Sequence, residues 1–110
     1  MLVAAQIAED PAGNRRQARR HRSNELARIR QFRQPPEMIH VTDISIDGCG
    51  FRARCSLPEG TRLLLNLPGL EVWLATVAWF EDGRGGLKFD RPLHPAVARR
   101  FAVPPDQSSR

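Results

Sequence analysis

The sequence of 110 residues has the length of one domain, and its 41% hydrophobic and 26% charged residues are typical of a folded globular protein. No apolar run approaches the roughly 18 residues that a membrane-spanning helix needs, which argues against a membrane span. The formal net charge is +5, all of it within residues 1–33, where eight arginines outnumber three acidic residues; this predicts an anionic partner.

The amino-terminal part of the chain shows no regular apolar period before residue 26. Residues 1–14 contain proline and glycine, and we expect them to form a flexible leader. The apolar stretch at residues 1–8 lacks a basic start and is followed by two acidic residues, so we expect no signal peptide and a cytoplasmic protein. A flexible basic arm, extended or irregular, then opens a folded domain at residues 15–103. Residues 104–110 are expected to form a disordered tail.

From residue 26 onward, short apolar runs alternate with turn residues at the spacing typical of β-barrels and sandwiches. This pattern predicts six antiparallel strands, at residues 26–34, 38–46, 51–55, 63–67, 72–80 and 87–89. Residues 82–86 are predicted as the last turn, and Pro95 opens a short helix at residues 96–101. Closing six strands into a barrel removes exposed sheet edges. We therefore predict an all-β protein, a six-stranded antiparallel β-barrel with a short carboxyl-terminal helix.

Two tryptophans and two cysteines are interpreted as packing residues. Trp73 and Trp79 share the parity of one predicted strand, and we expect both to pack in the core or on the barrel surface. Cys49 and Cys55, if they lie on one strand, are roughly 20 Å apart, which is too far for a disulfide. Neither has the spacing to a histidine that a metal site requires. We therefore expect two buried thiols and no metal.

Signatures of catalysis do not occur in the sequence. It contains no GxSxG elbow, no HExxH pair, no phosphate-binding P-loop and no CxxC motif. We therefore expect a protein that is not an enzyme and that needs no cofactor.

The segment from Asp43 to Gly48 interrupts the strand pattern. On a strand, Asp43 and Ser45 share one face, and Ile44 faces the other way. Because Val41 has the opposite parity to Ile44, the buried face switches between them, which a bulge, a tight bend or a strand end would explain. Gly48 supplies a backbone that can turn or approach a ligand closely. This pattern fits a turn capped by Asp and Ser, or a ligand-binding ledge.

The basic arm contains two overlapping arginine pairs at a spacing of four residues. Arg15 pairs with Arg19, and Arg16 pairs with Arg20. Alone, such a cluster is typical of a solvated basic arm.

Taken together, the two segments resemble the PilZ family of bacterial cyclic di-GMP receptors. That family is marked by an RxxxR motif followed, some twenty to thirty residues later, by [D/N]xSxxG. Arg16 and Arg20, or Arg15 and Arg19, match the first motif, and both registers stay open. The second motif is complete in Asp43, Ser45 and Gly48, and the resemblance extends over residues 15–101.

The resemblance implies a barrel that binds cyclic di-GMP on its outside and signals as a receptor or adaptor. Its ligand-binding residues would be Arg15, Arg16, Arg19, Arg20, Asp43, Ser45 and Gly48. The arginines would contact phosphate and the O6/N7 edge of guanine, which a guanidinium group can bond bidentately. The carboxylate would accept hydrogen bonds from guanine N–H groups. Binding would order the arm against the barrel and change the surface that a downstream protein partner reads.

Two other functions compete with this interpretation. The basic arm could bind nucleic acid, although the seven aromatic residues mostly follow a core pattern instead of forming stacking platforms, which makes this partner the less favoured one. Alternatively, the chain is a PilZ-like adaptor that binds no nucleotide and acts through protein contacts alone. Binding measurements separate the three.

Overall fold

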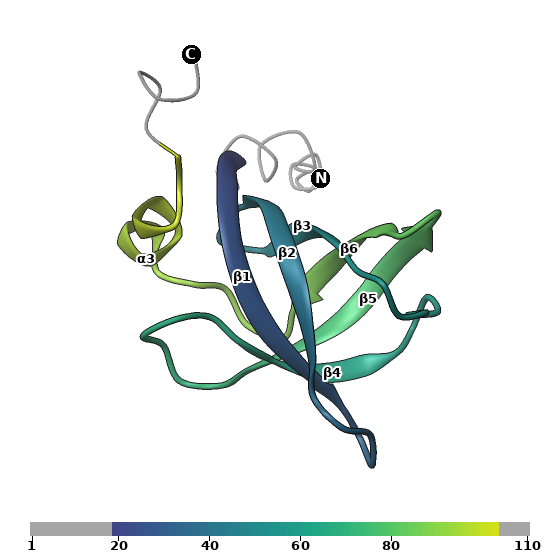
Figure 1. Cartoon of the computed structure of the whole chain (residues 1–110). Coiled ribbons are helices and arrows are strands. Elements are labelled where there is room, and N and C mark those ends of the chain that lie inside the picture. Colours follow the sequence, from purple (N-terminus) through teal and green to yellow (C-terminus); the bar gives the residue numbers. More distant parts are fainter. Residues whose placement is uncertain (1–18, 104–110) are drawn as a thin grey trace, which may run out of the picture.

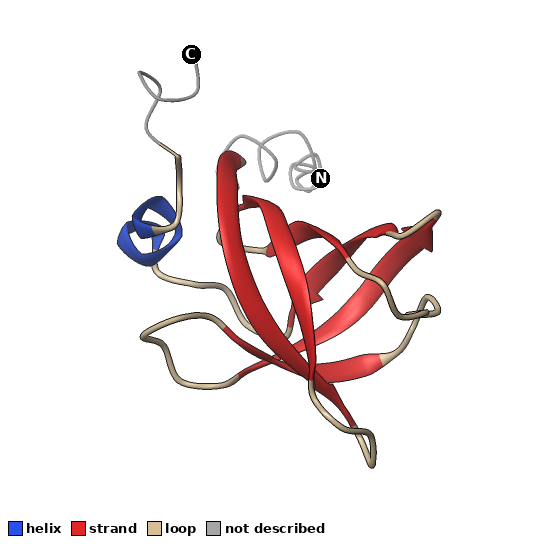
Figure 2. Ribbon diagram, in the orientation of Figure 1, coloured by secondary structure: helices blue, strands red, loops and turns tan. Residues whose placement is uncertain are grey.

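The computed structural model describes residues 19–103, so the predicted leader and tail, together with Arg15 and Arg16, lie outside the described residues. In the described part, six antiparallel strands close into a barrel in the order β1-β2-β3-β6-β5-β4 (Figure 1). Figure 2 shows the strands of the barrel in red and the helix beside it in blue. The elements are β1 (His21–Gln31), β2 (Glu37–Ile44), β3 (Gly48–Arg52), β4 (Arg62–Asn66), β5 (Trp73–Glu81), β6 (Arg84–Phe89) and α3 (Pro95–Arg100). The predicted fold class is confirmed.

The barrel interior is a single apolar core to which all six strands contribute. Alternation builds it: in β1, Ala27 and Ile29 are buried, whereas Leu26 and Arg28 between and beside them are exposed. Leu57, Leu93 and Phe101, which lie outside the strands, join the same buried cluster.

The ends of several predicted strands were wrong. β1 begins at His21, five residues earlier than predicted, and stops at Gln31, where the N–H of Gln34 donates to the Gln31 carbonyl oxygen at 3.0 Å and closes the turn. The predicted strand at residues 51–55 ends at Arg52, because its partner strand β6 begins at Arg84, opposite Arg52, and only the Asp82–Gly83 turn lies beyond it.

The last hairpin turn is also shorter than predicted. Asp82 and Gly83 alone form it, with φ of 55° and 78°, the conformation of the two-residue turns that match strand twist. Gly85 and Gly86, predicted as turn residues, belong to β6. A Cβ atom on Gly85 would lie 2.6 Å from the Phe51 ring, so this glycine serves packing and not turning.

Two bulges change which way the side chains point. The pairing of β2 with β3 shifts register between Val41 and Asp43, which confirms the predicted switch of the buried face. The pairing of β5 with β6 shifts between Val77 and Trp79. The predicted common parity of the tryptophans is therefore wrong: Trp73 packs against the core, and Trp79 is 49% exposed.

The segment after α3 returns to the start of β1 and is hydrogen-bonded to it. The buried Ser23 hydroxyl donates to the Phe101 carbonyl oxygen at 2.7 Å, and the Val103 N–H donates to the Arg22 carbonyl oxygen at 2.7 Å. Ser23 and Ala102 also form an isolated β-bridge. Within residues 19–103, no helix is long and apolar enough to cross a membrane.

Both cysteines carry free thiols, but only one of the two is buried as predicted. Cys49 lies inside the barrel, whereas Cys55 is half-buried, because β3 ends before it and it follows in a loop. Burial, reinforced by the nearby Asp43 carboxylate, raises the pKa of the Cys49 thiol to about 12.

This raised pKa predicts that the protein loses stability in alkaline solution. Above about pH 9 the thiol of Cys49 ionises in the unfolded chain but stays protonated in the native one, so the free energy of unfolding falls as the pH rises toward 12. We expect urea titrations between pH 8 and 11 to show a smaller decline for Cys49→Ala than for wild type. Equal declines would contradict the assignment.

Candidate functional site

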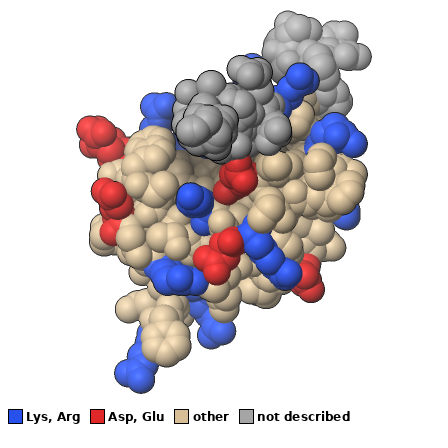
Figure 3. All heavy atoms as spheres, turned by 180° about the vertical axis from the view of Figure 1, so that it is seen from behind, with Lys and Arg blue, Asp and Glu red and all other residues tan. Residues whose placement is uncertain are grey.

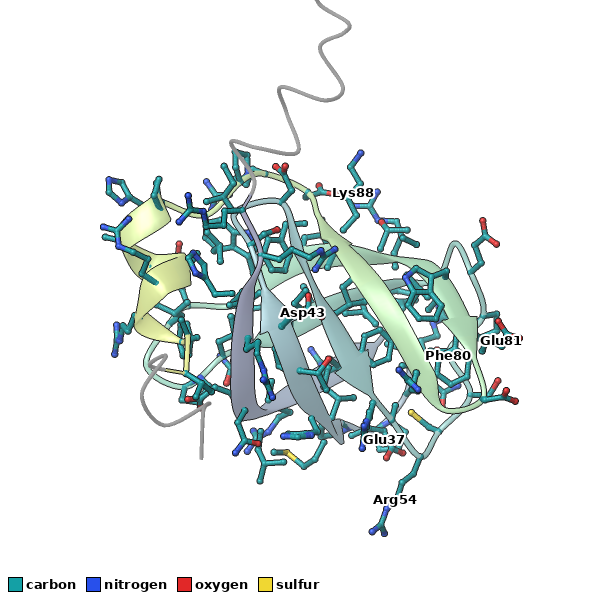
Figure 4. All side chains as sticks on the ribbon, turned by 90° about the horizontal axis from the view of Figure 1, so that it is seen from above. Glu37, Asp43, Arg54, Phe80, Glu81 and Lys88 are labelled. Carbon is teal, nitrogen blue, oxygen red and sulfur yellow. The ribbon has the colours of Figure 1, made fainter. Side chains whose placement is uncertain are left out.

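The carboxylate of Asp43 lies on the outside of β2, at the bulge. Figure 4 shows it over the middle of the upper face, far from the labelled Phe80 and Glu81 at the end of the β5–β6 hairpin. Its Oδ1 atom accepts a hydrogen bond from the Gly50 N–H at 3.1 Å and forms an ion pair with the guanidinium group of Arg20. The side chain is 34% exposed, so a ligand can reach it.

The arginines around this carboxylate come from the start of β1. Arg20 directly precedes the strand, and its side chain is 59% exposed. Arg22 is the direct cross-strand neighbour of Asp43 and is exposed as well. Arg19 is exposed, and the structure shows no hydrogen bond or ion pair between Arg19 and Asp43. Of the two RxxxR registers, Arg20 of the pair Arg16–Arg20 therefore contacts the aspartate, and the first arginine of each pair lies outside the described residues.

Ser45 does not share the outward face of Asp43, which is a correction to the prediction. β2 ends at Ile44, and Ser45 turns inward and is only 2% exposed. Its hydroxyl accepts from the Asp47 N–H at 3.2 Å and lies 3.3 Å from the Gly48 carbonyl oxygen, to which it can donate. The hydroxyl thus stabilises the β2–β3 turn that follows Asp43. Its contact with a ligand stays a prediction.

Gly48 is required by the close approach of two strands. A Cβ atom here would lie 2.0 Å from the Leu87 carbonyl oxygen of β6, which is backbone and cannot rotate away. The residue is buried at the first position of β3. The lack of a side chain at Gly48 therefore allows β3 and β6 to pack closely. Its contact with a ligand stays a prediction.

A row of cross-strand neighbours connects Asp43 with Trp79, which was predicted to be a packing residue. Asp43 is paired with Gly50, Gly50 with Gly86, and Gly86 with Trp79. A Cβ atom on Gly50 would lie 2.4 Å from the Asp43 carboxylate, and one on Gly86 would lie 2.5 Å from the Trp79 indole nitrogen. The two glycines thus leave room for the carboxylate and the indole to lie against the sheet.

This arrangement can bind a flat, polar ring. The carboxylate accepts hydrogen bonds from N–H donors, the half-exposed indole offers a stacking face, and the guanidinium groups attract anions. The pair of glycines inside strands is a sequence signal for this row that the prediction did not use, because such glycines mark places where another group approaches the backbone. Among the described residues, no group of three or more His, Cys, Asp or Glu side chains could hold a metal ion.

The fold and this outer face define a small β-barrel domain whose polar site lies on the outside of the sheet. A family model described as the PilZ domain matches residues 14–102. The chain belongs to the PilZ domain family. Members of this family are known as receptors for cyclic di-GMP and not as enzymes. No curated protein matches the chain.

Proposed function

We propose that this chain is a cyclic di-GMP receptor and that the ligand binds on the outer face around Asp43. The observation that carries the proposal is the half-exposed carboxylate paired with Arg20, beside a floor formed by two strand glycines. Cyclic di-GMP supplies matching groups, namely guanine N–H donors, guanine O6/N7 acceptors and two phosphates.

Binding exchanges one set of charge-assisted contacts for another. Without ligand, Arg20 neutralises Asp43. With ligand, the carboxylate accepts from the guanine N–H groups, and the released guanidinium group contacts a phosphate or the O6/N7 edge. Because each ionic group exchanges one partner for another, neither is left desolvated and unpaired. Trp79 then stacks on a purine ring at the other end of the row.

The remaining arginines complete the site. Arg15, Arg16 and Arg19 contact the phosphates and the second guanine, and the arm is ordered against the barrel as they bind. Ser45 and Gly48 hold the turn that positions Asp43, and their backbone lines the ligand. The ordered arm changes the surface that a downstream protein partner reads, so the chain acts as an adaptor in the cytoplasm of a bacterium without catalysing a reaction.

The charge pattern on the face shown in Figure 3 supports a nucleotide more than a nucleic acid. A nucleic-acid surface needs a basic track along the phosphate backbone. On the face in Figure 3, the described acidic and basic side chains are interspersed instead of gathering by sign. A steep salt dependence with RNA, without preference for cyclic di-GMP, would favour nucleic acid.

Calorimetric titration with cyclic di-GMP tests the proposal on the full chain. Wild type should release heat, and Arg20→Ala should bind about 10-fold more weakly, the lower part of the ~1–3 kcal/mol range for one guanidinium–guanine contact. Arg62→Ala is the matched control, because Arg62 forms an ion pair with Asp90 at 3.3 Å on another part of the barrel. No heat with wild type would overturn the proposal and favour the adaptor that binds no nucleotide.

A further inference from the structure

A groove lies on the outer face of β1, β4 and β5, away from the candidate nucleotide site. Its volume is about 420 Å³. Arg30, Leu64 and Leu74 lie along its floor as a row of cross-strand neighbours. Phe32 and Arg33, which follow the end of β1, line it as well. The groove and the nucleotide site share β1 and β5 but use opposite ends of each strand. Arg22 near the start of β1 and Trp79 near the end of β5 belong to the nucleotide site, whereas Arg30 near the end of β1 and Leu74 near the start of β5 line the groove.

Two of the apolar residues that line the groove are exposed without a folding reason. Phe32 is 83% exposed and Leu74 is 37% exposed, and neither belongs to the buried core. The β1–β2 turn projects beyond the body of the barrel (Figure 1), and two prolines, Pro35 and Pro36, restrict its backbone. Apolar surface rimmed by charge marks interaction sites, because exposing it to water costs free energy that a partner recovers.

The positive charges that line the groove indicate an acidic partner. Arg30, Arg33 and Arg62 line it, and no carboxylate is among the described residues that do so. Asp90, which does not line the groove, forms an ion pair with Arg62 at 3.3 Å. A second copy seated on this face would bring like charges together, which is destabilising. The closed barrel also offers no sheet edge to which a second copy could add a strand.

A peptide fits this lining better than a nucleic acid does. Single-stranded nucleic acids bind to successive aromatic platforms, and Phe32 is the one aromatic residue among the described lining residues. Leu64 and Leu74 instead suit an aliphatic or aromatic anchor side chain. We propose that this groove docks an acidic segment of a partner protein, with an apolar anchor over the two leucines and carboxylates paired with Arg30, Arg33 and Arg62.

Titration of the 15N-labelled full chain with a probe peptide tests this proposal. The probe has twelve residues in alternating pairs of glutamate and leucine, and the comparison peptide carries lysine for glutamate. Saturable shifts of the Leu64 and Leu74 amides are expected with the first peptide alone. Phe32→Ser and Arg30→Ser should each weaken binding at least fivefold; Arg54→Ser, an equal change of charge at an exposed loop residue outside the groove, should change it less than twofold.

Several outcomes would overturn the docking proposal. These are equal binding of the lysine peptide, equal weakening by Arg54→Ser, tighter binding of an oligothymidylate at the same amides, and self-association that Phe32→Ser abolishes. The titration contains no nucleotide, and Asp43→Ala should bind the peptide as wild type does. The experiment therefore distinguishes failure of the docking proposal from failure of the cyclic di-GMP proposal.

Discussion

Asp43→Ala should weaken cyclic di-GMP binding by about 30- to 100-fold. The substitution removes the acceptor for two guanine N–H groups, and a lost bidentate base contact costs about 1–3 kcal/mol. It also leaves Arg20 without its ion-pair partner, so the phosphate contact of Arg20 persists and binding is weakened but not abolished. Because the carboxylate is 34% exposed, water can solvate the Gly50 N–H that it releases, and the barrel should remain folded.

Two comparison variants make this result specific. Asp43→Asn keeps the shape and one acceptor oxygen and should lose less affinity than Asp43→Ala. Asp90→Ala removes a carboxylate of similar exposure from the ion pair with Arg62 and should bind like wild type. Equal affinities of Asp43→Ala and Asp90→Ala, measured by calorimetry at one salt concentration, would show that the ligand does not touch Asp43.

Gly48→Ala should lower the free energy of unfolding by about 3 kcal/mol or more, among the larger effects of single substitutions. The added methyl group would lie 2.0 Å from the Leu87 carbonyl oxygen, so β3 and β6 must separate and their ladder must weaken. For a domain of this size, the expected fall in melting temperature is more than about 12 °C. Thermal unfolding followed by circular dichroism measures it.

Gly60→Ala is the matched control for this experiment. A Cβ atom on Gly60 meets nothing within 4 Å, although its φ of 89° is strained for alanine, so a cost of about 1 kcal/mol is expected. If Gly48→Ala melts like wild type yet loses cyclic di-GMP, the glycine of the motif serves the ligand and not the fold.

The strands could be predicted from the sequence because the barrel is lined by alternate residues. Leu63, Leu65 and Leu67 alternate with more exposed neighbours, and this period of two is readable without tertiary information. The ends of the strands could be predicted less accurately, because they depend on which residues of the neighbouring strands lie opposite them. Ala53 continues the apolar alternation of β3 but lies beyond the strand, because the residue opposite it, Gly83, thirty residues further along the chain, belongs to the β5–β6 turn.

The site could be predicted in part. Asp43 and the face switch beside it were visible as a break in parity. Ser45 was misplaced because the strand ends one residue before it, and parity has no meaning beyond a strand end. The parity predicted for Trp79 was wrong because the bulge in β5 depends on the pairing of that strand with β6. The row from Asp43 to Trp79 joins four strands, and a single sequence does not give their registers.

Hydrogen bonds connect the start of β1 to the segment after α3. The Val103 N–H donates to the carbonyl oxygen of Arg22, the cross-strand neighbour of Asp43. The Phe101 carbonyl oxygen accepts from the buried Ser23 hydroxyl. A polypeptide truncated after the last strand would uncover apolar surface under the helix and leave the Ser23 hydroxyl without its acceptor. We therefore expect a stably folded barrel to need the chain as far as Val103, because the segment after α3 supports the strand that faces Asp43.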